Sequence, residues 1–217
     1  MYRVIQWATG GVGKAAIQGV LRHPELDLVG CWVHSADKSG RDVGELAGED
    51  PIGVLATNDI EELLALDADC VMYSPLLPDD QVVIRILQSG KNVVTPVGWV
   101  YPDRKSPAVA AIEAACVAGN VTLHGSGIHP GGITERFPLM ISSLSSAITH
   151  VRAEEFSDLR TYNAPMVVRE VMGFGLTPEQ AMNGPMAVLL EAGCKQSVRM
   201  VTDQLRFDAE PRIRSTQ

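Results

Sequence analysis

Positive charge is scarce in this chain of 217 residues, which has 18 lysines and arginines against 26 aspartates and glutamates. The formal net charge of −8 and the lack of any Lys/Arg cluster argue against a surface that binds nucleic acid or an anionic membrane. The sequence also lacks an apolar run long enough to cross a bilayer, and residues 1–7 lack the pattern of a signal peptide. These absences predict a cytoplasmic protein with no nucleic-acid partner and no membrane partner.

Paired cysteines are also missing. The four cysteines lie far apart in the sequence, with no C-x-x-C and no paired His/Cys spacing, at Cys31, Cys70, Cys116 and Cys194. Structural zinc sites and disulfide frameworks need close, regular spacings, so we expect no metal site and a reducing compartment.

Short apolar runs alternate with helical patterns along the first 125 residues. The predicted helices include 13–22, which ends before His23-Pro24, and a helix that starts at Asp79. The predicted strands cover residues 4–8, 28–33, 53–57, 70–73, 92–96 and 121–124. This alternation is typical of βαβ units and predicts an α/β fold, a doubly wound parallel Rossmann sheet, in residues 1–127.

The pattern changes after Gly125-Ser126-Gly127. We predict helices over 134–143, 165–172 and 185–205 and a strand over 148–153, which makes residues 128–217 a smaller α+β domain. Its last residues, 206–217, are polar and show no final helix or strand, so we expect this domain to be truncated.

A glycine-rich turn joins the first predicted strand to the first predicted helix. Its residues Ala8, Thr9, Gly10, Gly11, Val12 and Gly13 fit the A/G-x-G-x-x-G pattern. Gly10 lets the backbone approach a pyrophosphate, and Gly13 lets the helix pack closely on the strand. The free N–H groups of the helix start then hold the phosphates, so we predict a bound dinucleotide, against the alternative of a tight turn without ligand. Ala8 in the first glycine's place is expected to strain the turn.

The residues after the second predicted strand favour NADP. An NAD-selective site usually has an acidic residue there for the ribose hydroxyls, but this chain has Val33-His34-Ser35. Ser35, Lys38 and Arg41 follow and could bind a 2′-phosphate. The alternative is that these side chains form a solvated loop, and Asp37 keeps NAD open.

Three more loops follow predicted strands, at the sheet edge where open α/β sheets bind ligands. They hold Tyr73, Ser74 and Pro75; Thr95, Val97 and Gly98; and residues 125–132. Their small residues and prolines suit close approach to the nicotinamide half of a cofactor, although each loop alone is ordinary turn chemistry. Tyr73, Ser74, Pro75, Thr95 and Val97 are therefore predicted to contact the cofactor.

His129 lies in the last of these loops and is the candidate catalytic residue. A histidine can donate a proton to a developing alkoxide or amine near neutral pH, but it could instead bind a substrate carboxylate or order the loop. Tyr101 and Tyr162 are candidate substrate-binding residues, and Glu135 is a further polar candidate with a surface or capping role as its alternative.

At these motifs the sequence resembles the dihydrodipicolinate reductase-like Rossmann family, above all its branch of 2,4-diaminopentanoate dehydrogenases and native amine dehydrogenases. The resemblance is carried by residues 7–13, by Thr95 with Tyr101-Pro102, and by Gly125-Ser126-Gly127-Ile128-His129-Pro130-Gly131-Gly132. His129 stands where the branch commonly has asparagine. The H-H-x-x-K-x-D motif of true dihydrodipicolinate reductases is absent.

The resemblance implies a two-domain enzyme that uses NAD(P)H to reduce a C=N or C=O carbon of a small molecule. It also implies a homodimer formed through the second domain, and a second domain longer than residues 128–217. Amine-forming members carry an acid after the fifth strand, where this chain has Val97 and Gly98, which places these two beside the substrate and leaves the amine product open. The alternative to an enzyme is a non-catalytic NAD(P)-binding sensor or interaction module.

Overall fold

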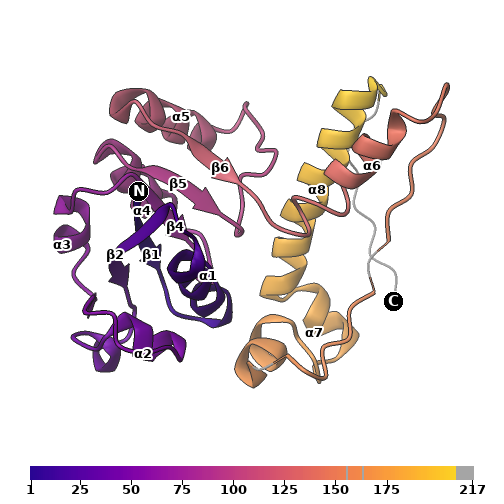
Figure 1. Ribbon diagram of the computed structural model, residues 1–217. Helices are drawn as coiled ribbons and strands as arrows, with labels where there is room; N and C mark the ends of the chain where they lie inside the picture. The colour runs from indigo at the N-terminus through magenta and orange to yellow at the C-terminus, as the bar shows by residue number, and fades with distance from the viewer. Residues whose placement is uncertain (155, 163, 209–217) are drawn as a thin grey trace. The chain divides into compact units, whose positions relative to one another are not determined.

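The computed structural model describes residues 1–154, 156–162 and 164–208, and the chain divides into two compact units, Met1–Ser126 and Gly127–Gln217 (Figure 1).

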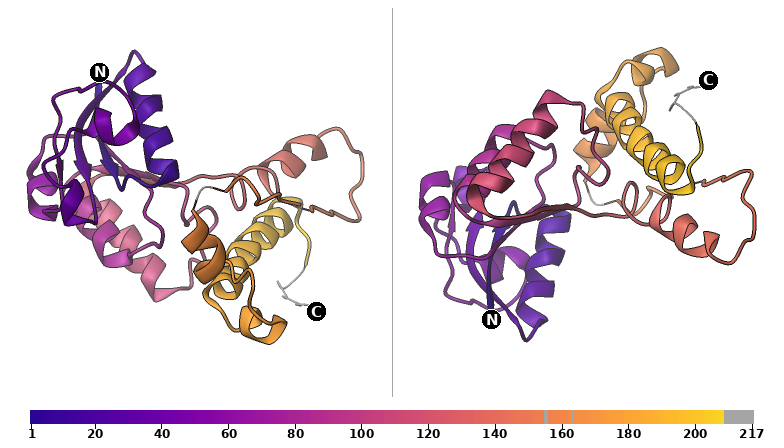
Figure 2. Two further views of the ribbon diagram at one scale, coloured as in Figure 1. Left: turned by 90° about the horizontal axis from the view of Figure 1, so that it is seen from below. Right: turned by 90° about the horizontal axis from the view of Figure 1, so that it is seen from above.

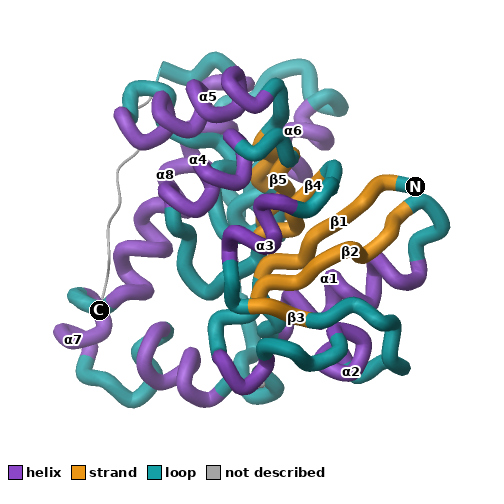
Figure 3. Tube along the Cα trace, turned by 90° about the vertical axis from the view of Figure 1, so that its left-hand side faces the viewer, coloured by secondary structure: helices purple, strands orange, loops and turns teal. Residues whose placement is uncertain are grey.

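The first unit is built on one parallel sheet of six strands (Figure 3). The strands are β1 Tyr2–Trp7, β2 Leu26–Trp32, β3 Ala56–Thr57, β4 Cys70–Tyr73, β5 Asn92–Thr95 and β6 Leu123–Gly125. Their order is β3-β2-β1-β4-β5-β6, so the chain changes direction across the sheet between β1 and β4. In such sheets a crevice opens at this change of direction, beyond the carboxyl ends of the strands. The predicted doubly wound Rossmann sheet is confirmed.

Helices cover both faces of this sheet (Figure 2). They are α1 Gly11–Arg22, the 3₁₀-helix η1 Ala36–Lys38, α2 Val43–Ala47, α3 Ile60–Ala65, α4 Asp80–Gln88 and α5 Pro107–Gly119. Side chains of α1 and α2 pack on one face with Val4 and Leu28. Side chains of α3, α4 and α5 pack on the other face with Ile5 and Val93. Alternate residues of β1 thus enter opposite cores, as the pleat of a strand requires.

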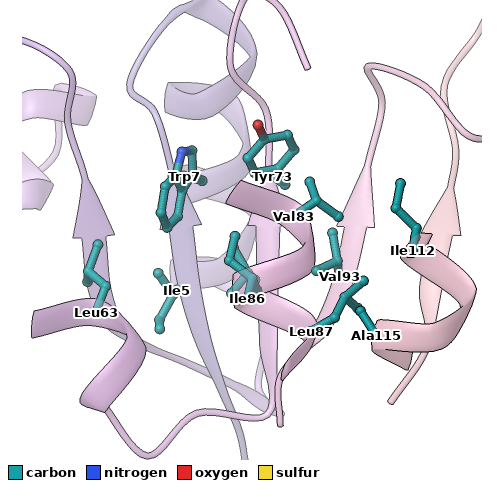
Figure 4. Close-up of a cluster of buried hydrophobic side chains, with 11 residues drawn as sticks. Ile5, Trp7, Leu63, Tyr73, Val83, Ile86, Leu87, Val93, Ile112 and Ala115 are labelled. Carbon is teal, nitrogen blue, oxygen red and sulfur yellow. The ribbon is translucent and has the colours of Figure 1, made fainter. Parts of the chain in front are cut away.

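Three aromatic side chains form a row across the carboxyl ends of the central strands. Trp7 pairs in register with Trp32 on one side and with Tyr73 on the other. The two indoles are stacked with ring centroids 5.0 Å apart, and the Trp7 and Tyr73 centroids are 5.9 Å apart. Figure 4 shows Trp7 and Tyr73 above the aliphatic part of the same cluster. Large rings that are packed in this way give the loops above them a firm base.

Hydrogen-bonding side chains define several helix starts. Asp59 and Asp79 accept backbone N–H bonds at the first turns of α3 and α4, and Asp79 is the residue at which the sequence predicts a helix to start. Asp42 does the same for α2, a short helix that the sequence patterns did not predict, and it also accepts from the backbone of Ile52 and Gly53. β6 begins at Leu123, two residues later than predicted. The reason is that the Val121 N–H donates to the Cys116 carbonyl at the end of α5 and is not free to join the sheet.

The second unit is helical in the part of it that the structure describes. Its helices are α6 Arg136–Ser142, the π-helical turn η2 Val167–Val171, α7 Pro178–Met182 and α8 Pro185–Leu205. The predicted helix over 185–205 is confirmed, but the strand predicted over 148–153 is wrong, because these residues form a mostly exposed loop. No strand occurs among the described residues of this unit, so the segment has nothing to pair with. Across residues 1–154, 156–162 and 164–208, no helix is both long enough and apolar enough to cross a membrane.

Candidate functional site

The glycine turn leads from β1 directly into the first turn of α1. Gly10 is the N-terminal cap residue, with φ −71° and ψ −173°, and it makes no side-chain cap bond. The first bond of the helix runs from the Lys14 N–H to the Gly10 carbonyl, so the amides of Gly11, Val12 and Gly13 have no partner within the helix. Such a helix start binds anions, because its N–H groups and its dipole both favour negative charge.

The glycines of this turn have two different roles. A Cβ atom on Gly13 would lie 2.1 Å from the Ala8 carbonyl oxygen, so glycine is needed there for α1 to pack on the end of β1. A Cβ atom on Gly10 or Gly11 would meet nothing within 4 Å, and the φ of Gly10 suits any residue. The fold therefore explains Gly13 but not Gly10 and Gly11, and the open space at those two suits an outside group.

Ala8 has φ +75°, in the left-handed region that favours glycine. The strain expected from alanine in the first glycine's place is thus present, at a cost of about 1–2 kcal/mol for a residue with a Cβ atom. Two hydrogen bonds hold the residue in place, because its N–H donates to the Trp32 carbonyl at 2.9 Å and its own carbonyl accepts from the Gln6 side-chain amide.

Gln6 is a fully buried amide under this turn, on the face of β1 that α1 covers. Its Nε2 donates to the carbonyls of Trp7 at 3.0 Å and Ala8 at 2.9 Å, and contacts the Ser74 hydroxyl at 2.8 Å. The Ser74 hydroxyl in turn donates to the Trp7 carbonyl at 3.2 Å. One side chain therefore ties the turn after β1 to the loop after β4, across the change of strand direction. Its own Oε1 is buried and has no hydrogen-bond partner.

Lys38 brings a cation to the same turn. Its Nζ donates to the Thr9 hydroxyl at 3.3 Å, and η1, which starts after Ser35, carries it there. Arg41 is exposed and joins the neighbouring structure through its backbone, with bonds to Lys38 and Ala56. Of the three residues predicted to bind a 2′-phosphate, Lys38 is the one that contacts the glycine turn.

The loops after β5 and β6 are bonded to each other. Thr95 is fully buried, its hydroxyl accepts from the Val97 N–H at 3.2 Å, and its carbonyl accepts from the Ser126 N–H at 2.8 Å. Gly125 lies against the backbone of Trp99, where a Cβ atom would come within 2.3 Å. Thr95 thus orders both loops from below, while Val97, Gly98, Tyr101 and Pro75 are half-buried at the same edge.

His129 belongs to the second unit, where it is part of a polar cluster between residues 129–135 and the helix α8. Its Nδ1 lies 2.7 Å from the Thr134 hydroxyl, which donates to Glu135 Oε1 at 2.5 Å. Glu135 is fully buried and also accepts from the Gly131 N–H at 2.7 Å and from the Ser197 hydroxyl. The surface role that was the alternative for Glu135 is therefore wrong. Tyr162, in the same unit, is 46% exposed.

Residues 4–75 match the family model described as dihydrodipicolinate reductase, N-terminus. Within the first unit, these residues are similar to the N-terminal domain of dihydrodipicolinate reductases. The chain is also 37% identical over 184 residues to an amine dehydrogenase of Streptomyces virginiae, a match that covers 81% of this chain and 51% of that one. A 4-hydroxy-tetrahydrodipicolinate reductase of Synechococcus elongatus is 40% identical over 63 residues, 29% of this chain and 23% of the other.

A solved structure has the same fold. The amine dehydrogenase of Mycobacterium smegmatis superposes with a TM-score of 0.67 at 19% identity, over 94% of this chain and 60% of that one. The chain thus spans about half the length of the Streptomyces relative and under two thirds of the Mycobacterium one.

Some residues of the glycine turn's surroundings and of the His129 cluster were not predicted. Gln6 is the only polar residue in the run Val4-Ile5-Gln6-Trp7-Ala8, and a polar residue in a buried strand just before a glycine turn was the available signal. Cys194 and Ser197 gave a weaker signal, because they are three residues apart on a long helix and contact His129 and Glu135 only through folding.

Proposed function

We propose that the chain is the nicotinamide-binding part of an NAD(P)H-dependent oxidoreductase that transfers hydride to a small carbonyl or imine substrate. The observation that carries this proposal is the start of α1. Gly10 and Gly11 have open space where a Cβ atom would lie, so the turn keeps a free approach to the helix amides that the fold itself does not need. A dinucleotide pyrophosphate is the group that this geometry fits. The relationship to an amine dehydrogenase supports the same class of reaction.

The residues present fit this cofactor. The amides of Gly11, Val12 and Gly13 would hold the pyrophosphate, and Lys38 beside Thr9 would add the positive charge that a 2′-phosphate needs. NADP is therefore the proposed cofactor, with NAD as its alternative. When bound, the nicotinamide supplies the hydride. The loops with Ser74, Thr95 and Val97 would order the site around it.

His129 is the proposed proton donor for the alkoxide or amine that forms as hydride arrives. Its Nδ1 is held by Thr134, so the proton to be donated would be carried on Nε2 of the charged ring, the nitrogen that lies 3.9 Å from the Cys194 sulfur. Val97 and Gly98 offer no carboxylate for an ammonium group, so a ketone or aldehyde substrate remains open beside an imine.

The full chain should first be titrated with NADPH and NADH by calorimetry, and then assayed for nucleotide oxidation on small ketones and aldehydes, with and without ammonium. The proposal expects saturable binding and turnover of at least one substrate. In Gly10→Asp, a carboxylate at the pyrophosphate site should abolish binding, while circular dichroism stays that of the original chain. Saturable binding that survives this substitution would overturn the assignment of the site.

The second candidate is a protein that binds the nucleotide without catalysis, as a sensor or interaction module. The lack of a carboxylate at Val97 and Gly98 favours it. Binding with no oxidation over the whole panel, with and without ammonium, would support this reading against the first.

A homodimer and a cytoplasmic location complete the proposal. Exposed apolar side chains on and after α6 support a dimer, since Phe137, Met140 and Leu144 are 55%, 65% and 85% exposed. Sedimentation equilibrium would test the homodimer, and cell fractionation would test the cytoplasmic location.

A further inference from the structure

Residues 129–135 are fastened to the middle of α8 by two close contacts. Gly193 allows the Pro130 ring to approach, because a Cβ atom there would lie 3.2 Å from the proline Cδ. One turn further along the helix, the Ser197 hydroxyl donates to the buried carboxylate of Glu135. Cys194 lies between these two positions on the same helix. The segment and the helix therefore form one built cluster of side chains.

The hydrogen bonds of this cluster determine where the His129 ring carries its proton. Thr134 has one hydroxyl hydrogen, and it donates that hydrogen to Glu135 Oε1 at 2.5 Å. At its other contact, 2.7 Å from His129 Nδ1, the same oxygen must then accept. Nδ1 therefore carries the hydrogen, and in the neutral ring Nε2 has the free lone pair.

That lone pair faces a thiol. Cys194 Sγ lies 3.9 Å from His129 Nε2, within the range of a sulfur hydrogen bond, and Cys194 is half-buried. The order of groups is carboxylate, hydroxyl, imidazole and thiol, which is the arrangement of an activated nucleophile and its oriented base. Glu135 and Thr134 orient the ring, and His129 can take the thiol proton.

We propose that Cys194 is a nucleophilic thiol, activated by His129, that adds to α,β-unsaturated carbonyl compounds. The thiol proton moves to His129 Nε2 as sulfur forms a bond to the β-carbon of the acceptor. The C=C π electrons move to the α-carbon, which then takes the proton back from the imidazolium. The product is a thioether, no leaving group departs, and no redox partner is needed. This addition does not depend on a bound nucleotide.

The other three cysteines of the chain are built-in controls. Cys31 is fully buried, and burial raises the pKa of its thiol to about 12, although the charge of Lys38 acts in the opposite direction. Burial likewise raises the pKa of Cys70. Cys116 is half-buried like Cys194, and in the described part of the chain no histidine is bonded to it. Cys116 is therefore the matched reference for a thiol without an activating base.

The test is limited labelling of the whole protein with acrylamide at neutral pH, followed by peptide mapping of all four cysteines by mass spectrometry. Cys194 is expected to react at least about tenfold faster than Cys116, a modest share of what general-base catalysis supplies. His129→Gln should bring the Cys194 rate down to that of Cys116 and leave Cys116 unchanged. Circular dichroism of this variant should match that of the original chain, so that the lower Cys194 rate does not come from a loss of folding.

A second pair of variants separates ring orientation from general packing. Thr134→Val keeps the shape of the side chain but removes the acceptor for Nδ1–H, so the Cys194 rate should fall severalfold. Thr134→Ser keeps the hydroxyl and should restore the rate. Equal labelling of Cys194 and Cys116 in the unaltered chain would overturn the proposal, and so would a Cys194 rate that does not change in His129→Gln.

Discussion

Two substitutions of the same kind, three residues apart, separate the ligand-binding role of the glycine turn from its structural role. Gly13→Ala places a methyl group where the Ala8 carbonyl oxygen is 2.1 Å away, although ordinary contacts begin near 3.4 Å. Backbone must move by more than 1 Å to relieve this overlap. The Ala8 carbonyl is already held by Gln6, so little relaxation is available.

We expect Gly13→Ala to lower the free energy of unfolding by about 3 kcal/mol, the upper end of what overpacking costs. Gly10→Ala adds the same methyl group in open space, at a φ that alanine adopts freely, so its only cost is a poorer helix cap, about 1 kcal/mol or less. Urea unfolding followed by circular dichroism measures both values. Calorimetric titration of the two variants with NADPH measures how each substitution changes the affinity for the nucleotide.

Gly10→Ala, which hardly affects the stability of the fold, should clearly affect nucleotide binding. A methyl group there occupies the approach to the helix amides, and we expect at least about a tenfold weaker affinity, or 1.4 kcal/mol. The reasoning would be refuted if Gly10→Ala bound NADPH as tightly as the original chain. It would also be refuted if both substitutions lowered the free energy of unfolding equally, because the close contact at Gly13 and the free space at Gly10 would then not affect stability differently.

Three further substitutions test the cofactor site, the buried amide under the glycine turn and the cap of α2. Lys38→Ala should weaken NADPH binding by about tenfold and NADH binding much less, because it removes a charge suited to a 2′-phosphate. Lys14→Ala on α1 is the control variant. Equal losses of affinity for both nucleotides in Lys38→Ala would contradict the NADP assignment. Gln6→Leu should lower the urea midpoint by the equivalent of about 1–3 kcal/mol, because the Ala8 and Trp7 carbonyls lose a buried donor; an unchanged midpoint would argue against a role for this amide. Burial acts to raise the pKa of Asp42, but its backbone N–H donors outweigh burial and hold that pKa below its usual value. The carboxylate therefore stabilises the fold above about pH 4 and loses this effect as pH falls through the lowered pKa, so Asp42→Asn should reduce the urea midpoint at pH 7 and make little difference near pH 2.

The Rossmann unit was predictable because its signals are local. Apolar runs mark the buried strands, Asp79 marks a helix start, and the glycine turn lies where β1 meets α1. The different roles of Gly10 and Gly13 could be stated in advance, since the pattern itself encodes both, and the space around each is as those roles require. The position of Lys38 was also within reach, because it follows a strand that neighbours β1.

The contacts that were missed depend on distant parts of the chain. Gln6 meets Ser74, which is 68 residues away, and Glu135 meets Ser197, which is 62 residues away. No periodicity within a window of a dozen residues contains such pairs. The predicted strand over 148–153 failed for a related reason, because alternation of side chains indicates a strand only where another strand is available to bond with it.

All three tryptophans of the chain lie at the carboxyl edge of the sheet, Trp7 and Trp32 at the ends of β1 and β2 and Trp99 in the loop after β5. The tryptophan emission of this protein therefore originates at this edge of the sheet, and the second unit, which has Tyr162 but no tryptophan, contributes none of it. A reduced nicotinamide absorbs in the band where indole emits, so a nucleotide in the proposed place would quench that emission by energy transfer. With excitation that selects tryptophan, the emission of this protein therefore reports whether a nucleotide is bound at this edge.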